Sequence, residues 1–483
     1  MRTVPGATHR VVVIGAGLSG LSAALRLRGA GREVTVVERS HQPGGLAGTL
    51  SAGGYHFDTG PTVLTMPELI DDALACVGER REDWLELTPL APAYRMFFPG
   101  GDHFDIHSDV ERTAAGIAEF ANPAAADGYR KFVAWVERLY ALEMRDFIDR
   151  NLDSPADLLR PALARLAATG GFRRLDGAAR RFLRDPRIRR AFTFQSLYAG
   201  LSPYDALALY AVISYMDTVH GVYFPAGGIH AVPLALAAAG EKNGIAFRYG
   251  TGVTQIARSN QRATGVILDD GERIPADAVV LATDPSQLLG RPRRRLRMAP
   301  SCVVLHAGGS STYRQISHHN VHFGQPWSGT FADVIDRGQL MSDPSLLVGN
   351  PSRTDPSLAP PGKQIYYVLA PVPNRHDSPI DWARLGPHYR DELLRILDRR
   401  GYVGLDLEVA EFVTPLDWEL AGQPAGTPFS VAHTFGQTGP FRPGNLASGW
   451  ENVVLAGAGT TPGVGVPMVL ISGRLAAERI TGR

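Results

Sequence analysis

The sequence predicts an α/β protein in which a parallel sheet is assembled from separated parts of the chain. Two glycine-rich turns, one near each end, each stand between an apolar, β-branched run and an apolar helical run. A third apolar run, Ala278–Ala282, has the length and composition of a buried strand returning to the same sheet. With 483 residues, 44% hydrophobic and 20% charged, the chain is long enough for two or three globular domains.

The first turn carries the pattern G-x-G-x-x-G. It follows a predicted strand, Val11–Ile14, and precedes a predicted helix, Leu21–Arg28. In this βαβ context the pattern is the dinucleotide-binding fingerprint of a Rossmann-like domain. Gly15 permits the tight turn, Gly17 lets the backbone approach a pyrophosphate, and Gly20 permits close packing of helix on strand.

An acidic residue completes the fingerprint. The predicted strand Glu33–Val37 ends in Glu38, at the offset expected for an acid that accepts the hydroxyls of an adenosine ribose. Pro43-Gly44-Gly45 follows only a few residues later, where a nicotinamide-binding domain normally continues into another helix and strand. A second glycine pair directly after the acid is typical of flavoproteins, so the sequence favours FAD over NAD.

The second turn, within Val454–Met468, precedes a predicted helix, Val469–Ile480. Its glycines remove side chains where a planar ligand needs the backbone close. The start of the helix offers free N–H groups and the positive end of a dipole. We expect this turn to form a third wall of the FAD site and to meet the pyrimidine edge of the isoalloxazine ring.

Four separated segments in the same order give the chain a specific resemblance. They are Phe57–Thr62, Gly221–Gly228, Tyr366–Pro373 and Gly457–Gly463. Over nearly its whole length the chain resembles the bacterial phytoene desaturase family, flavin-dependent carotenoid desaturases within the amine-oxidase-like flavoprotein superfamily. It departs from the family at Leu46, where many members carry an arginine beside the diphosphate.

The resemblance and the glycine motifs together assign the cofactor contacts. The predicted FAD-binding residues are Gly15, Ala16, Gly17, Ser19, Gly20, Glu38, Arg39, Gly44, Gly45, Leu46, Gly60, Pro61, Thr62, Val253, Gly457, Ala458, Gly459, Gly465, Val466 and Pro467. Two further departures lie in the last turn, Thr461 in place of a common histidine and Met468 in place of a common glycine. We expect these two positions to influence which carotenoid fits.

The resemblance implies FAD-dependent desaturation of phytoene to zeta-carotene, neurosporene or lycopene. The flavin takes a hydride at N5, and oxygen or a membrane quinone reoxidises it. Asp58 is a candidate catalytic residue, with a cap of its own turn as the alternative. Arg145 and Asp146 are a candidate proton-handling pair, with a solvated helix face as the alternative.

Three other functions share these motifs or this fold class. A carotenoid isomerase, or a desaturase of a hydroxylated or C30 carotenoid, would carry every motif named above. A prenyl-binding protein of the GDP-dissociation-inhibitor type shares the fold class without using a flavin, and the intact fingerprint argues against it. An amine oxidase would commonly surround a cationic amine with aromatic side chains.

The resemblance divides the chain into two discontinuous domains. The predicted FAD-binding domain consists of residues 8–75, 221–286 and 445–483. The predicted substrate domain, of mixed α+β structure with a helical, membrane-facing part, consists of residues 76–220 and 287–444.

Composition excludes several classes of protein. Lys and Arg number 49 against 48 Asp and Glu, a net charge of +1, so we expect no nucleic-acid partner. The two cysteines imply no disulfide framework and fit a reducing cytoplasm. We expect no metal: His318, His319 and His322 are close in sequence but show no zinc-ligand motif.

An arginine-rich segment, Arg160–Arg190, suggests a membrane contact. It follows an apolar stripe and contains Arg173, Arg174, Arg180, Arg181, Arg184, Arg187, Arg189 and Arg190. A basic amphipathic segment can lie on an anionic bilayer; the alternative is a solvated face paired with acids elsewhere. Because no apolar run reaches transmembrane length, we expect a cytoplasmic protein bound peripherally to the inner face of the cell membrane.

Overall fold

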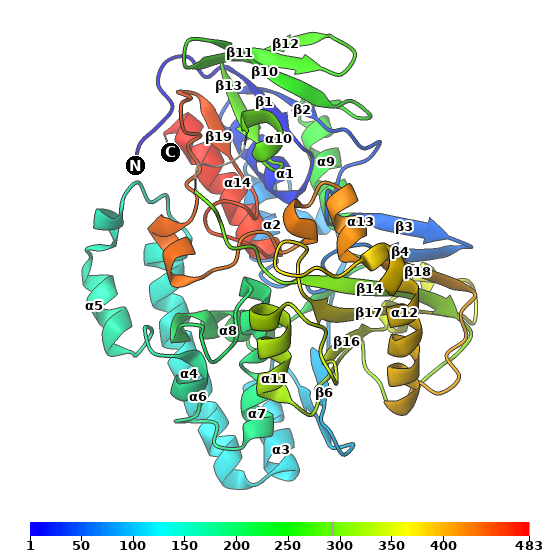
Figure 1. Ribbon diagram of the computed structural model, residues 1–483. Coiled ribbons are helices and arrows are strands. Elements are labelled where there is room, and N and C mark those ends of the chain that lie inside the picture. The colour runs from blue at the N-terminus through cyan, green and yellow to red at the C-terminus, as the bar shows by residue number, and fades with distance from the viewer. Residues whose placement is uncertain (291–293, 483) are drawn as a thin grey trace.

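A five-stranded parallel sheet forms the centre of the computed structural model, which describes residues 1–290 and 294–482 (Figure 1). Its strands, in spatial order, are β19 (Val453–Leu455), β13 (Ala278–Leu281), β1 (Arg10–Ile14), β2 (Glu33–Val37) and β9 (Ala246–Arg248). Strands far apart in sequence are neighbours, because β13 pairs with β1 on one side and with β19 on the other. The Rossmann-like α/β fold predicted from the sequence is confirmed.

Alternate residues of these strands face two different layers. Val11 and Val13 pack with three helices, α1 (Leu18–Gly29), α9 (Ala231–Lys242) and α14 (Val466–Thr481). Val12 and Ile14 point to the opposite face and pack with a three-stranded antiparallel sheet. That sheet consists of β10 (Val253–Ser259), β11 (Arg262–Leu268) and β12 (Arg273–Pro275). Burial on both faces explains why these strands read as continuous apolar runs.

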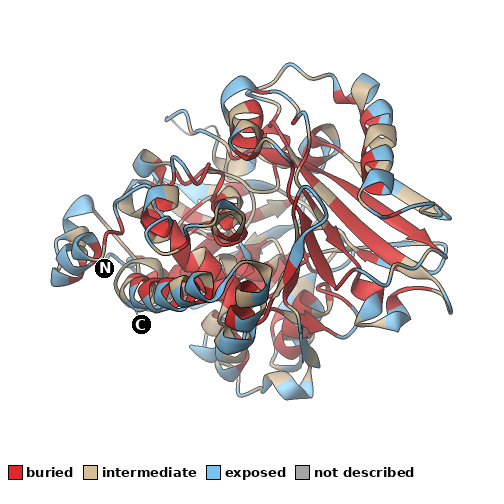
Figure 2. Cartoon of the chain, turned by 90° about the horizontal axis from the view of Figure 1, so that it is seen from below, coloured by how far each residue is buried: buried red, intermediate tan, exposed pale blue. Residues whose placement is uncertain are grey.

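A seven-stranded mixed sheet forms the second half of the molecule. Its strands, in spatial order, are β18 (Val409–Val413), β14 (Ser301–Gly309), β17 (Gln364–Val372), β16 (Leu346–Gly349), β15 (His319–His322), β6 (Tyr94–Phe97) and β7 (His103–Ile106). Val303 and Leu305 of β14 pack with the long helix α12 (Trp382–Arg399). Cys302 and Val304 point the other way, toward a small cluster that includes Trp418. Figure 2 shows the sheets as buried and the outer sides of the helices as exposed.

A group of helices packs below the two sheets in the view of Figure 1. It contains α3 (Val110–Phe120), α4 (Pro123–Glu143), α5 (Pro161–Ala168), α6 (Leu175–Ala179), α7 (Pro186–Ala191) and α8 (Ala211–Thr218). The apolar stripe that precedes the arginine-rich segment does not lie on one continuous helix, because a 3₁₀ turn, Pro155–Leu158, is separated from α5. Pro161 is the reason: its ring disfavours helical backbone at Arg160, which is extended at φ −130° and ψ 154°.

Shorter elements connect these layers. They are β3 (Thr49–Ala52), β4 (Tyr55–Asp58), α2 (Glu68–Ala75), β5 (Leu87–Pro89), β8 (Tyr223–Pro225), α10 (Ser286–Leu289), α11 (Trp327–Phe331) and α13 (Pro415–Leu420). Within residues 1–290 and 294–482, no helix has the length and apolar composition needed to cross a bilayer.

Candidate cofactor and active site

The carboxyl ends of the parallel strands bring the first and last glycine turns together. The Gly15 N–H donates to the Val37 carbonyl at 2.8 Å, and the Ala456 N–H donates to the Leu281 carbonyl at 3.0 Å. Behind the turns, α1 packs along α14. Ligands of open parallel sheets bind at this carboxyl edge, so the two turns lie where a nucleotide cofactor is expected.

The three glycines of the fingerprint are required for different physical reasons. Gly15 has φ +101°, a conformation that residues with a Cβ rarely adopt. A Cβ on Gly20 would collide with the Gly15 carbonyl oxygen. Gly17, in contrast, has an ordinary φ of −73°, and its Cβ would meet nothing closer than the Gly44 carbonyl oxygen at 3.9 Å. Packing of the chain therefore does not require glycine at position 17, and the open space beside it suits a ligand.

The start of α1 is also free for an anion. Gly17 is the N-cap residue, and no side chain of residues 1–290 or 294–482 accepts a hydrogen bond from the first turn of the helix. Uncapped N–H groups and the helix dipole together favour a phosphate at such a position. Ser19, another predicted contact, is buried in this first turn.

Glu38 is buried at the end of β2 and lies against the same turn. Its carboxylate accepts the Ala16 N–H at 2.8 Å and the Ser40 N–H at 2.9 Å. The Glu38 backbone carbonyl accepts the Thr251 N–H at 3.1 Å, which brings the start of β10 alongside. Val253, the predicted adenine contact, begins that strand, so both residues lie on the same side of the first glycine turn.

The second glycine pair is hydrogen-bonded to the first turn. The Gly44 N–H donates to the Ala16 carbonyl at 2.9 Å, and Gly17 and Gly44 form a parallel bridge. The buried side chain of His230 holds this loop through a 2.8 Å hydrogen bond between its Nε2 and the Pro43 carbonyl. Sequence reasoning missed His230, although it lies two residues after the Gly221–Gly228 segment that supported the resemblance.

Three of the remaining predicted contacts have visible partners. The Arg39 guanidinium donates to the Ala421 carbonyl at 2.8 Å. Leu46 packs into the apolar cluster of Cys302 and Trp418, a hydrophobic contact that a charged arginine head group would not make. The Gly60 carbonyl accepts the Tyr367 hydroxyl at 3.0 Å.

Asp58, the last residue of β4, connects this strand to the start of α9. Its carboxylate accepts the N–H groups of Ile229 at 3.0 Å and His230 at 3.2 Å. Burial raises the pKa of Asp58 to about 6, and the two N–H donors limit the rise. A positioning role for Asp58 therefore has direct structural support, while its catalytic role stays a prediction.

Arg145 and Asp146 form an ion pair in the turn after α4, with 2.9 Å between Arg145 Nη2 and Asp146 Oδ2. The Arg145 side chain is 70% exposed. Their proton-handling role also stays a prediction.

Glu143, two residues before Arg145, is buried, and its Oε1 has no hydrogen-bond partner among the described residues. Burial holds the pKa of Glu143 well above its ordinary value, so this acid is an unforeseen candidate.

The three neighbouring histidines have separate protein partners. The ring nitrogens of His319 bind the carbonyls of Thr62 and Ala93 at 3.1 and 3.3 Å. His322 Nε2 lies 3.0 Å from the Tyr402 hydroxyl, and His318 Nδ1 has its own hydroxyl partner. These contacts account for the cluster as buried structural histidines.

The last glycine turn is fixed by hydrogen bonds to Ser472 and Arg442, two residues that sequence reasoning missed. The Gly457 N–H donates to the Ser472 hydroxyl at 3.0 Å. Arg442 is buried and lies eleven residues before the start of β19, and its Nε donates to the Thr460 carbonyl at 2.9 Å. Gly465 is the N-cap of α14, and a Cβ there would meet no protein atom within 4 Å. As at Gly17, space is left open beside a helix start.

Comparison with known proteins decides the family. The model of the flavin-containing amine oxidoreductases matches residues 18–481. A phytoene dehydrogenase of Streptomyces griseus is 57% identical across all of this chain and 97% of its own length. A zeta-carotene-forming phytoene desaturase of Myxococcus xanthus is 37% identical across 98% of this chain and 94% of its own. The chain belongs to the phytoene desaturases, within the flavin-containing amine oxidoreductase family.

The fold and the geometry of the site both agree with a flavin-containing oxidoreductase. A solved putrescine oxidase variant has the same fold, with a TM-score of 0.61 over 99% of this chain and 100% of its own, at 17% identity. The cofactor of this phytoene desaturase family member is FAD, as predicted. The open spaces at Gly17 and Gly465 and the uncapped start of α1 agree with that cofactor.

Proposed function

We propose that this protein uses FAD to desaturate a carotenoid precursor such as phytoene. The main support is that three glycine-rich turns lie together at one edge of the parallel sheet. The chain is also similar over its full length to a phytoene dehydrogenase. Its products would be zeta-carotene, neurosporene or lycopene, the products named for relatives of the chain.

The predicted contacts assign each part of FAD to the residues that would bind it. The start of α1 at Gly17 would hold the pyrophosphate, and Glu38 would accept the ribose hydroxyls. Val253 would meet the adenine, and the turn from Gly457 to Pro467 would meet the flavin ring. Bound FAD supplies a hydride acceptor at N5 for the substrate C–H bond. The protein would orient the polyene and exclude water, with residues 8–75, 221–286 and 445–483 as the cofactor domain.

Turnover of phytoene in liposomes tests the proposal. Purified protein is incubated anaerobically with and without a quinone, and the pigments are separated by chromatography. We expect conjugated products to accumulate past one equivalent of enzyme only when quinone or oxygen is present. Conversion of a cis-carotene to its trans form without turnover of phytoene would establish the isomerase instead.

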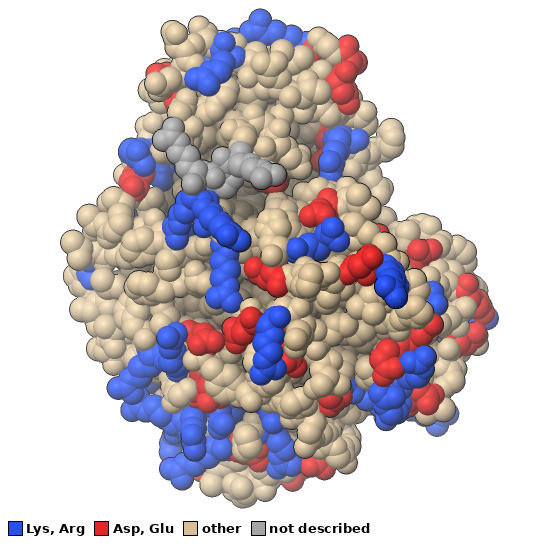
Figure 3. Space-filling view, viewed as in Figure 1, with Lys and Arg blue, Asp and Glu red and all other residues tan. Residues whose placement is uncertain are grey.

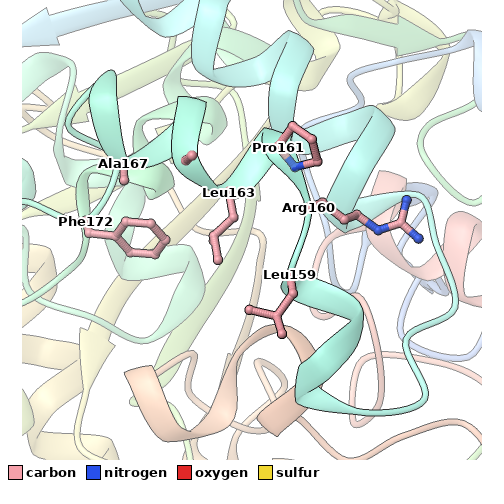
Figure 4. A pocket seen from close by; sticks show the side chains of 7 residues that line it. Leu159, Arg160, Pro161, Leu163, Ala167 and Phe172 are labelled. Carbon is pink, nitrogen blue, oxygen red and sulfur yellow. The ribbon is translucent and has the colours of Figure 1, made fainter.

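An apolar surface formed by α5 and the residues that flank it, called here the α5 surface, supports peripheral membrane association. Leu159 is 80% exposed and Phe172 is 40% exposed. Together with Leu163, they line a surface hollow in which the three side chains project into one space, while Arg160 extends away from them (Figure 4). Large apolar side chains exposed together mark contact sites.

Basic residues follow this apolar surface. Arg187 and Arg189 have acidic partners, Asp185 and Asp176. In the described chain no ion pair is formed by a second group of exposed arginines, Arg165, Arg173, Arg180, Arg181 and Arg184. Figure 3 shows Lys and Arg gathered over the lower part of the molecule, where α6 and α7 lie. Unpaired arginines beside exposed apolar side chains suit an anionic bilayer surface.

Vesicle flotation separates the apolar and electrostatic contributions. We expect Leu159→Ser/Phe172→Ser, and separately Arg173→Ser/Arg180→Ser/Arg181→Ser/Arg184→Ser, to reduce binding to anionic vesicles at least about tenfold, since each basic residue near such a surface contributes about 1 kcal/mol. The matched control is Val403→Ser/Leu420→Ser, two side chains that are 69% and 77% exposed elsewhere. Equal flotation of all three variants would contradict the α5 surface.

A further inference from the structure

Arg442 carries a buried guanidinium that has no acidic partner in the described part of the chain. Arg442 is 3% exposed, and among the described residues it donates hydrogen bonds only to carbonyl oxygens, those of Ala458, Thr460, Val431 and Gln437. The charge is retained at neutral pH, because burial lowers the pKa of Arg442 only to about 10. The neighbouring Tyr210 is its one favourable electrostatic contact with a titratable group of the described chain. A buried charge in this position lacks compensation unless negative charge arrives from elsewhere.

Two of these four carbonyls belong to the last glycine turn. Nε lies 2.9 Å from the Thr460 oxygen, and Nη2 lies 2.5 Å from the Ala458 oxygen. In a trans peptide the C=O and the following N–H point in opposite directions. Arg442 therefore turns the N–H groups of Gly459 and Thr461 away from itself. No acceptor in the described part of the chain takes a hydrogen bond from either N–H.

A cation bound to a carbonyl strengthens the N–H of the same peptide as a donor. Hydrogen bonds polarise one another in a chain, and the effect is larger where water is excluded. Here the guanidinium binds the carbonyl side of peptides 458–459 and 460–461, leaving both N–H groups polarised and unpaired. Donors fixed in advance toward developing negative charge are the basis of electrostatic stabilisation in enzymes.

We propose that Arg442 is a positioning residue that polarises the Gly459 and Thr461 N–H groups and thereby stabilises negative charge on the reduced flavin. This inference rests on the proposed function, in which this turn meets the flavin ring. Arg442 acts through the two peptides and does not itself touch the cofactor. The polarised N–H groups would thereby shift the reduction equilibrium of the bound flavin toward the reduced form.

The test compares flavin potentials in holoenzyme variants. In Arg442→Gln the charge is lost, and we expect the two-electron reduction equilibrium to move at least about tenfold toward oxidised flavin, or about 30 mV. Sulfite, which adds to oxidised flavin and leaves negative charge on the ring, should bind at least about tenfold more weakly. Arg442→Lys retains the charge and should give a smaller change in both measurements.

A second buried arginine provides the matched control. Arg479 is 2% exposed and lies on α14, but it is ion-paired with Asp153. Arg479→Gln should lower stability and leave potential and sulfite affinity unchanged. If both variants shift the potential equally, or if flavin-loaded Arg442→Gln has the potential of the unsubstituted protein, the inference is overturned.

The unsubstituted holoenzyme gives a measurement that does not depend on folding of a variant. In mildly acidic buffer free flavin takes up two protons with two electrons, whereas a stabilised anion takes up one. We expect the pH dependence of the potential to correspond to one proton, and a two-proton slope would overturn the inference. Absence of any flavin spectrum in purified protein would instead overturn the proposed function.

Discussion

At the scale of single residues, the second and third glycines of the fingerprint have different roles, one in ligand binding and one in folding. Gly17 has room for a Cβ in the chain itself, whereas Gly20 packs against the Gly15 carbonyl and Ala282. In this motif Gly17 leaves space open for a ligand, and Gly20 is needed for the contact between helix and strand.

Alanine substitution tests this separation. Gly17→Ala should leave the thermal stability of the apoprotein unchanged and weaken FAD binding at least about tenfold, because its Cβ occupies the space beside the pyrophosphate. Gly20→Ala should destabilise the apoprotein by about 1–3 kcal/mol, the usual cost of overpacking. Thermal melts and flavin titration measure the two effects, and equal apoprotein stabilities would contradict the distinction.

Asp58 makes stability depend on pH. Its pKa is raised from 3.8 to about 6, so its stabilising contribution is complete below pH 3.8 and is lost as pH rises through about 6. Relative to Asp58→Asn, which does not titrate, the unsubstituted protein should lose about 2–3 kcal/mol between about pH 4 and pH 7. Urea unfolding at both pH values measures the difference. A constant difference would show that Asp58 is not titrating in this range.

At the scale of elements, the sequence predicts best where one local signal is enough. The strand Glu33–Val37 was located to the residue, and the final helix begins only three residues before its predicted start. The short strand β15 was not predicted, because its sequence His-Asn-Val-His is mostly polar and its pairing partner β6 is distant in sequence. Likewise, His230 and Arg442 carry no motif: their importance comes from carbonyls that only the folded chain brings to them.

The start of α4 allows a direct test of helix capping. The Asn122 side chain accepts the Ala125 N–H at 2.9 Å, and Pro123 occupies the first helical position. Asn122→Ala should lower the free energy of unfolding by about 1 kcal/mol, and Asn122→Asp should retain most of it. Equal losses in both variants, measured by denaturant titration, would show that the cap does not stabilise the helix.

At the scale of the whole molecule, the cofactor site depends on strands from three regions of the chain. Bound FAD would contact turns that follow β1, β2 and β19, so it should stabilise the assembled sheet. At a free FAD concentration one hundred times the dissociation constant, stabilisation of about 2.7 kcal/mol is expected. Calorimetry of apoprotein and FAD-saturated protein measures this value, and coincident transitions would indicate that the site does not bind FAD.

The position of β19 beside β13 has a consequence for biosynthesis. During translation, the β13 edge of the sheet remains unpaired until residues 453–455 have left the ribosome, long after β1 and β2. An unpaired strand edge is prone to association with other chains. The cofactor pocket is therefore completed late in synthesis, and FAD that binds at that point would stabilise the sheet with its β13 edge covered.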